Sequence, residues 1–277
     1  MSTEMLSYID RPSFIHKLSG ITKLIFFLLW STVAMISYDI RILLVMLCGS
    51  FLIFKISKIR FKEISFIFWL IIIFLALNTI TIYIFSPQEG VHLYGSSHVL
   101  LKGIGRYNLT EEQLFYLSNI ILKYLVVTPI ALLFVTTTHP SEFASSLNKV
   151  GVSYKIAYAV SLALRYIPDI QRDFKTVSKA QQARGIDLSS KSKLRKRVKN
   201  YAMILIPLIL SSLDRVELID NAMELRSFGK KNKRTWYSEK SIKKRDIAVL
   251  FVSIVLFVLS FSIMFMNHSR FYNIFKK

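Results

Sequence analysis

Long apolar runs alternate with basic stretches along the whole of this chain. Five runs reach, or come close to, the roughly 20 residues that an α-helix needs to cross a hydrocarbon core. They are residues 21–38, 42–56, 64–85, 115–136 and 247–266. Backbone polar groups find no water inside a membrane, so these runs must form helices that satisfy them internally. The pattern predicts an all-α, polytopic membrane protein with about five transmembrane helices.

Positive charge between the runs predicts the orientation of the chain. Four basic residues follow the second run between positions 55 and 62, which is typical of a cytoplasmic loop. Residues 86–113 hold two basic and three acidic residues, and we expect them outside. Residues 138–245 hold 23 of the 37 basic residues and 9 of the 17 acidic ones, so this segment is predicted to be cytoplasmic. The N-terminus is then expected inside and the C-terminus outside.

These patterns divide the chain into three parts. Residues 1–137 are predicted to hold four transmembrane helices, residues 138–244 a cytoplasmic domain, and residues 245–277 a C-terminal transmembrane helix and tail. The composition fits, because 53% hydrophobic residues and a net charge of +20 occur together. A nucleic-acid-binding protein could be as basic but would not need spans of membrane length. Cys48 is the only cysteine, so no disulfide within the chain is possible.

The basic segment is predicted to form one short and two long helices. The short helix covers residues 140–150 and opens with a proline and an acidic residue, as helix N-termini favour. The long helices cover residues 153–184 and 192–228. Pro168 and Pro207 lie inside them, and we expect a kink at each.

The first long helix carries small residues at close-packing intervals. Ala157 pairs with Ser161, and Ala159 pairs with Ala163, four positions apart on one face. Small residues at this spacing let a second helix approach closely. This face is predicted to pack against a neighbouring helix or a membrane partner.

Both long helices end in similar sequences. The first ends Gln182-Ala183-Arg184-Gly185, and the second ends Glu224-Leu225-Arg226-Ser227 with a glycine shortly beyond. An arginine in the last turn complements the helix dipole, and a glycine just after it commonly ends a helix. A guanidinium also presents a planar fork that pairs bidentately with carboxylates. Two such forks on consecutive helices could bind two similar partners.

On the basis of these two helix ends, the chain resembles the transmembrane T component of energy-coupling factor (ECF) transporters. That family closes two long coupling helices with Ala-Arg-Gly motifs, and residues 183–185 match the first completely. The second motif keeps Arg226 but has Leu225 for alanine and Ser227 for glycine. Arg226 therefore remains the residue expected to bind a partner, and the two departures call into question how tightly the backbone turns at this helix end. The resemblance extends through residues 13–18, 22–23, 136–140 and 162–168, and so covers most of the chain.

The resemblance implies a function. Arg184 and Arg226 would bind two ATP-binding-cassette ATPases, identical or different, with Glu224, Pro168 and Pro207 in support. The chain would pass their motion to a small membrane S component that binds a vitamin, a precursor or a metal ion. It would itself be non-catalytic and bind no cofactor, with ATP and Mg²⁺ held by the ATPases. The family also implies the plasma membrane of a prokaryote and contact with membrane lipids.

Two other functions compete with this one. Asp169 and Asp173 form a D-x-x-x-D pair, as in intramembrane prenyltransferases that hold Mg²⁺-diphosphate, but the sequence has no second such cluster. A self-sufficient permease would need polar groups deep in several spans, and these spans are nearly bare of them. Lys123 is one exception, and we interpret it as a side chain that reaches the membrane interface.

A catalytic or metal-binding function finds little further support. The sequence lacks the G-x-x-x-x-G-K-[ST] loop, so ATP would have to be used by a partner. His92 and His98 occur in the outer loop and are interpreted as surface residues rather than as metal ligands.

Overall fold

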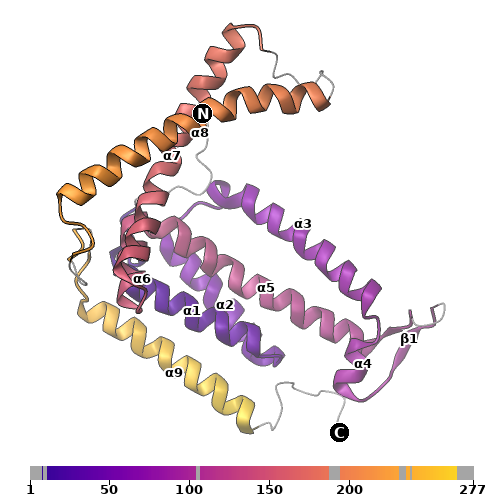
Figure 1. The fold of residues 1–277 in the computed structure, drawn as a ribbon. Coiled ribbons are helices and arrows are strands. Elements are labelled where there is room, and N and C mark those ends of the chain that lie inside the picture. Colours follow the sequence, from indigo (N-terminus) through magenta and orange to yellow (C-terminus); the bar gives the residue numbers. More distant parts are fainter. Residues whose placement is uncertain are drawn as a thin grey trace. The chain divides into compact units, whose positions relative to one another are not determined.

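The computed structural model describes residue 8 and residues 11–103, 107–186, 194–230, 235–237 and 239–266. Contacts divide the chain into two compact units. The membrane unit consists of residues 1–142 and 240–277, and the crossed-helix unit consists of residues 143–239. The described part is almost entirely helical, which confirms the predicted all-α class (Figure 1).

The membrane unit contains most of the elements. They are η1 (Ile15–Lys17), α1 (Gly20–Ile36), α2 (Ile40–Ser57), α3 (Phe61–Phe85), α4 (Glu89–Tyr94), β1 (Val99–Leu101), β2 (Leu109–Thr110), α5 (Glu111–Thr137) and α9 (Lys244–Met266). Among the described residues, α2, α3, α5 and α9 are long and apolar enough to cross a membrane, and α1 is a shorter apolar helix of 17 residues. The chain therefore has the multi-span character that its apolar runs predict.

α5 is the central helix of this unit, and it packs against α1, α2 and α3. More than half of its apolar window is buried, whereas only 6% of the corresponding windows of α3 and α9 is buried. α3 and α9 therefore present most of their surface to lipid. Helix packing around α5 is tight where Gly49 of α2 faces Trp30 of α1, because a Cβ at Gly49 would lie 2.9 Å from the indole ring.

Short polar side chains begin several of the helices. Ser19 accepts from the amide of Thr22 at the start of α1, and Thr110 accepts from the amide of Gln113 at the start of α5. Each cap satisfies a backbone donor that the first helical turn leaves free. α4 and the antiparallel β1–β2 pair lie between α3 and α5 and were not predicted from the sequence.

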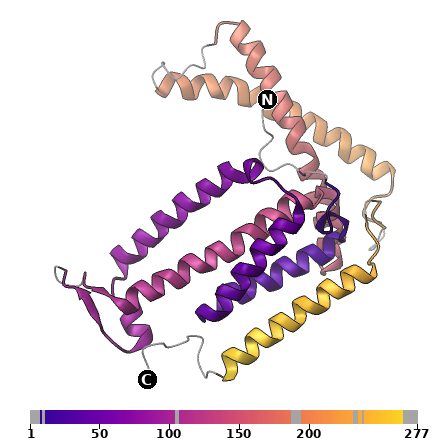
Figure 2. The same ribbon diagram turned by 180° about the vertical axis from the view of Figure 1, so that it is seen from behind.

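The crossed-helix unit is built on α7 (Tyr154–Ala183) and α8 (Leu194–Leu225). α6 (Pro140–Lys149) begins in the membrane unit and continues into this one. The start predicted for the second long helix, at residue 192, lies outside the described residues. Both long helices run without interruption through the prolines at positions 168 and 207. Figures 1 and 2 show that α7 and α8 cross, and their contacts agree.

Candidate functional site

The C-terminal end of α7 is closed by a pair of backbone hydrogen bonds around Arg184. The amide of Gly185 donates to the carbonyl of Gln182 at 2.9 Å, and the amide of Ile186 donates to the carbonyl of Gln181 at 3.1 Å. Gly185 has a φ of 86°, in the left-handed region. This combination is a Schellman motif, which satisfies the last carbonyls of a helix. Arg184 is the C-cap residue of α7, directly after Ala183, and its side chain is exposed.

The end of α8 has the same backbone pattern around Arg226. The amide of Ser227 donates to the carbonyl of Glu224 at 2.8 Å, and the amide of Phe228 donates to the carbonyl of Met223 at 3.0 Å. Ser227 takes the left-handed conformation with a φ of 53°. The replacement of glycine by serine therefore leaves the backbone motif intact. Both arginines occupy the same position of the same motif.

The two ends differ in the side chains that flank each arginine. Leu225 is 88% exposed beside Arg226, whereas the small Ala183 holds the matching place beside Arg184. Glu224 is exposed as well. Isolated exposed leucines are ordinary on protein surfaces, but one this fully exposed beside an arginine offers an apolar contact to a partner.

Aromatic packing fixes the end of α8 beside the start of α7. The ring of Phe228 lies 4.7 Å from that of Tyr158 and 5.6 Å from that of Tyr154, measured between centroids. Trp236 packs against the same two tyrosines and donates from its indole nitrogen to Asn148 at 3.2 Å. Arg226 is therefore held near the N-terminal end of α7 by a packed aromatic cluster.

Arg184 lies at the other end of α7. It follows Tyr158 by about 26 residues, which corresponds to roughly 40 Å at 1.5 Å per residue. Figure 1 shows the ends of α7 and α8 on separate arms of the crossed pair. The two arginines therefore lie near opposite ends of α7.

Two of the small residues predicted to pack closely, Ala159 and Ala163, lie in an open groove between α7 and α8. Ala157 is fully buried and Ser161 is partly buried. Ala159 and Ala163 line a groove of about 380 Å³, whose opposite wall is formed by α8 from Ser212 to Met223. The neighbouring element at this face is thus α8.

Both carboxylates of the acidic pair in the enzyme alternative contact arginines. Asp173 accepts from the guanidinium of Arg215 on α8 at 2.7 Å, and Asp169 lies 3.6 Å from Arg172. Within the described residues, no group of three or more histidine, cysteine or acidic side chains could hold a metal ion. These carboxylates instead pair with arginines, one of them across the crossing of the two helices.

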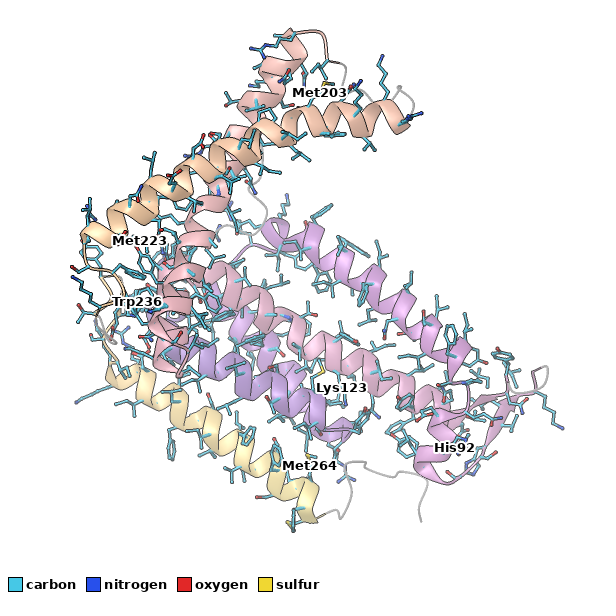
Figure 3. All side chains as sticks on the ribbon, viewed as in Figure 1. His92, Lys123, Met203, Met223, Trp236 and Met264 are labelled. Atoms are coloured by element: carbon cyan, nitrogen blue, oxygen red, sulfur yellow. The ribbon has the colours of Figure 1, made fainter. Side chains whose placement is uncertain are left out.

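The interpretation of Lys123 as a side chain that reaches the membrane interface is wrong. Lys123 is only 6% exposed, and its ammonium donates to the carbonyl oxygen of Met35 at 2.8 Å. The ammonium also lies 3.1 Å from the centre of the Tyr38 ring. Figure 3 labels this residue on α5, among the helices of the membrane unit. Lys123 therefore acts inside the unit, where it binds the last turn of α1.

Residues between α3 and α5 hold α4 and the β-strands onto α5. His98 contacts Glu112 at 2.7 Å through Nδ1, and Gln113 accepts from the amide of Gly90 at 2.8 Å. Asn119 donates to the hydroxyl of Tyr94, and burial raises the pKa of Tyr94 to about 12. His92 is exposed on α4.

These features define a class of protein: a multi-span helical membrane component that carries a separate pair of crossed helices with arginine at their ends. Residues 11–237 match the profile of the family described as CbiQ, cobalt transport protein. The match covers well over half of the chain, so the chain belongs to this family, which includes the transmembrane T components of ECF transporters.

Individual relatives support the same assignment over most of their length. The chain is 28% identical over 268 residues to the energy-coupling factor transporter transmembrane protein EcfT of Bacillus subtilis, covering 92% of this chain and 95% of the relative. It is 29% identical over 269 residues to EcfT of Streptococcus thermophilus, covering 91% and 96%. It is 26% identical over 257 residues to EcfT of Exiguobacterium sibiricum, covering 90% and 94%.

Proposed function

We propose that this chain is the membrane subunit that couples ATP hydrolysis by two partner ATPases to substrate release from an S component. Arg184 and Arg226 each bind a groove on one ATPase, and α7 and α8 carry the movement of the ATPases to the membrane. The chain itself hydrolyses no ATP, so ATP and Mg²⁺ belong to the partners. The substrate, whether a vitamin, a precursor or a metal ion, is selected by the S component.

The observation that carries this proposal is the equivalence of the two helix ends. The same Schellman hydrogen bonds place an exposed arginine at the same position after α7 and after α8. A guanidinium binds carboxylates through two parallel hydrogen bonds, and this geometry is demanding. A single arginine at a helix end would be explained by the helix dipole alone. Two ends with the same backbone, separated by the length of α7, favour two partners of similar structure.

The orientation follows from the same proposal. The segment that holds α7 and α8 carries most of the basic residues, and basic loops are retained on the cytoplasmic side. ATP is available on that side of a cell membrane, here the plasma membrane of a prokaryote. The N-terminus and the crossed-helix unit would then be cytoplasmic, and α4 with the β-strands would face outside.

The test is co-purification of the chain with its two ATPases from cells that express all subunits together. Arg184→Glu and Arg226→Glu should each reduce the amount of bound ATPase at least tenfold, because loss of a hydrogen-bonded charge pair at an interface costs about 2–5 kcal/mol. Arg165→Glu is the matched control, since Arg165 is an exposed arginine on α7 away from both ends. It should retain the ATPases.

Two outcomes would contradict the proposal. Full retention of the ATPases by both end variants would show that the arginines do not bind them. Substrate uptake into liposomes that contain this chain alone would favour the self-sufficient permease instead. The membrane yield and gel-filtration profile of each variant should match those of the unaltered chain, so that loss of binding is not loss of folding.

A further inference from the structure

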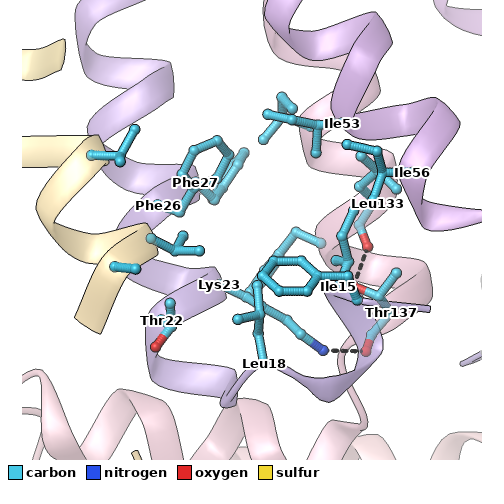
Figure 4. A pocket seen from close by; sticks show the side chains of 16 residues that line it. Ile15, Leu18, Thr22, Lys23, Phe26, Phe27, Ile53, Ile56, Leu133 and Thr137 are labelled. Carbon is cyan, nitrogen blue, oxygen red and sulfur yellow. Dashed lines mark hydrogen bonds between the residues drawn. The ribbon is translucent and has the colours of Figure 1, made fainter. Parts of the chain in front are cut away.

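The membrane unit contains an apolar cavity of about 320 Å³ near its basic end (Figure 4). Five elements form its walls, namely η1, α1, α2, α5 and α9. Representative lining residues are Leu18, Phe27, Ile53, Leu133 and Val252. The walls are almost wholly apolar, so the cavity offers no set of hydrogen-bond partners that would hold water. Hydrocarbon is the chemistry that matches it.

Lys23 lies at one end of the cavity, and its ammonium is hydrogen-bonded to the protein backbone. The side chain of Lys23 lines the cavity, and its ammonium donates to the carbonyl oxygen of Thr137 at 2.6 Å. Figure 4 shows this bond at one end of the cavity, close to Leu18 and Ile15. The ammonium is directed at the end of α5 rather than into the cavity. The interior is therefore suited to an uncharged chain.

The cavity is open along one side of the unit. Two of its lining residues, Phe14 and Ile56, remain 44% and 52% exposed. Val252 on α9 lines it too and is 54% exposed. These residues lie just before η1, on α2 and on α9, so a molecule in the surrounding membrane can enter laterally between these elements.

Exposed cations lie on the same elements as the lining residues, at the end of the cavity where Lys23 lies. Lys17 belongs to η1, Lys55 precedes the lining residue Ile56, and Lys244 and Arg245 lie one turn before the lining residue Ala248. Basic groups at the edge of a membrane-embedded site favour anionic lipid headgroups. Apolar walls inside the cavity and cations at this end match the two parts of an anionic phospholipid.

The end of the cavity at Lys23 distinguishes a lipid chain from a partner helix. The side chains of Lys23 and Thr137 lie at this end, so a helix about 10 Å wide could not continue past them. A single acyl chain is narrow enough to enter the cavity.

We propose that this cavity binds an acyl chain of an anionic phospholipid from the leaflet at the basic end, whose phosphate is bound by Lys17, Lys55, Lys244 and Arg245. The bound chain fills the space between α1, α2 and α9 and becomes part of the packing of the membrane unit. This proposal stands independently of the partners of Arg184 and Arg226.

The experiment uses the full chain in phosphatidylcholine vesicles that contain a trace of photoreactive lipid. The probe is phosphatidylglycerol with a diazirine on its acyl chain, and the reference probe is phosphatidylcholine with the same chain. Crosslinked peptides are located by mass spectrometry. The phosphatidylglycerol probe should label the cavity residues of α2 and α9 at least fivefold more than α3, which is equally accessible to bulk lipid. The phosphatidylcholine probe should show no such preference.

Two matched variants on α9 separate the cavity from the general lipid surface. Val252→Trp places a large ring in the cavity and should reduce labelling there to the level of α3. Phe251→Trp changes the neighbouring residue, which is 68% exposed and does not line the cavity, and should leave labelling unchanged. Lys244→Gln with Arg245→Gln alters only exposed cations and should remove the preference for phosphatidylglycerol.

The proposal has two clear ways to fail. Equal labelling of the cavity and of α3 by phosphatidylglycerol would show that no lipid is bound there specifically. Equal labelling of the cavity by both probes would overturn the assignment of an anionic headgroup. Neither result depends on a variant that might fail to fold, because both use the unaltered chain.

Discussion

The ammonium of Lys23 lies 2.6 Å from the carbonyl oxygen of Thr137, the last residue of α5. Lys123 of α5 makes the converse contact, since it donates to Met35 in the last turn of α1. Each of these two helices therefore carries a lysine that satisfies the C-terminal end of the other. The last carbonyls of a helix have no partner within the helix, and the negative end of its dipole favours a cation.

Removal of Lys123 should destabilise the membrane unit. In Lys123→Met, the carbonyl of Met35 loses its donor in a water-poor setting, and an unsatisfied buried acceptor costs about 1–3 kcal/mol. Removal of a buried charge offsets part of this cost, but the stacking of the ammonium on Tyr38 is also lost. We expect a lower melting temperature in detergent. Lys102→Met, at an exposed lysine, is the control and should melt as the unaltered chain does.

The left-handed residue at each helix end should respond differently to substitution. Gly185→Ala forces an alanine to a φ of 86° and should weaken the end of α7 by about 1 kcal/mol, although no neighbouring atom would clash with the new Cβ. Ser227→Gly relieves strain at a φ of 53° and should leave the end of α8 equally or slightly more stable. Hydrogen exchange at the backbone amides of Ile186 and Phe228 measures the stability of the two helix ends. Faster exchange at Phe228 in Ser227→Gly would contradict this account.

Leu225 should contribute to partner binding but not to folding. Because its side chain is 88% exposed, Leu225→Ala should change stability by less than about 0.5 kcal/mol. Burial of a leucine at an interface is worth about 1.5–3 kcal/mol relative to exposure, so ATPase affinity should fall roughly tenfold. Leu218→Ala, at a 70% exposed leucine of the same helix, should not change affinity. Titration of labelled ATPases onto the solubilised chain distinguishes the two.

The pairing of Asp173 with Arg215 should be weak and structural. Both side chains are more than one-third exposed, and exposed pairs contribute about 0–1 kcal/mol. A double-mutant cycle with Asp173→Asn and Arg215→Gln should therefore give a coupling energy below about 1 kcal/mol.

Transport by the assembled complex should persist in Asp169→Asn. Complete loss of transport in that variant, with assembly intact, would reopen the Mg²⁺-dependent enzyme alternative.

The fold class was predictable because one physical constraint dominates the sequence. A membrane span needs a long apolar run, and such runs are visible without any structure. The helix between Glu89 and Tyr94 and the two short strands after it were not predictable on this basis. They are brief, and their stability comes from contacts with α5, such as that of Gly90 with Gln113, rather than from periodicity.

Only part of the candidate site could be predicted from the sequence. Arg184 and Arg226 were found because their flanking residues repeat, but their functional role stays a prediction. The role of Lys123 was missed because the sequence does not reveal that α1 ends at Ile36, beside the middle of α5. The sequence also could not show which helix faces Ala159 and Ala163, because that depends on how α7 and α8 cross.

The hydrogen bonds around Ser227 have a consequence for how related chains are recognised. The left-handed turn after α8 forms without glycine, at a cost small enough for the aromatic packing of Phe228 to offset. A search for the letters Ala-Arg-Gly would overlook this end, whereas a search for an arginine one position before a left-handed residue would find both. In distant homologues, the backbone conformation at the helix end then identifies this site more reliably than the Ala-Arg-Gly sequence does.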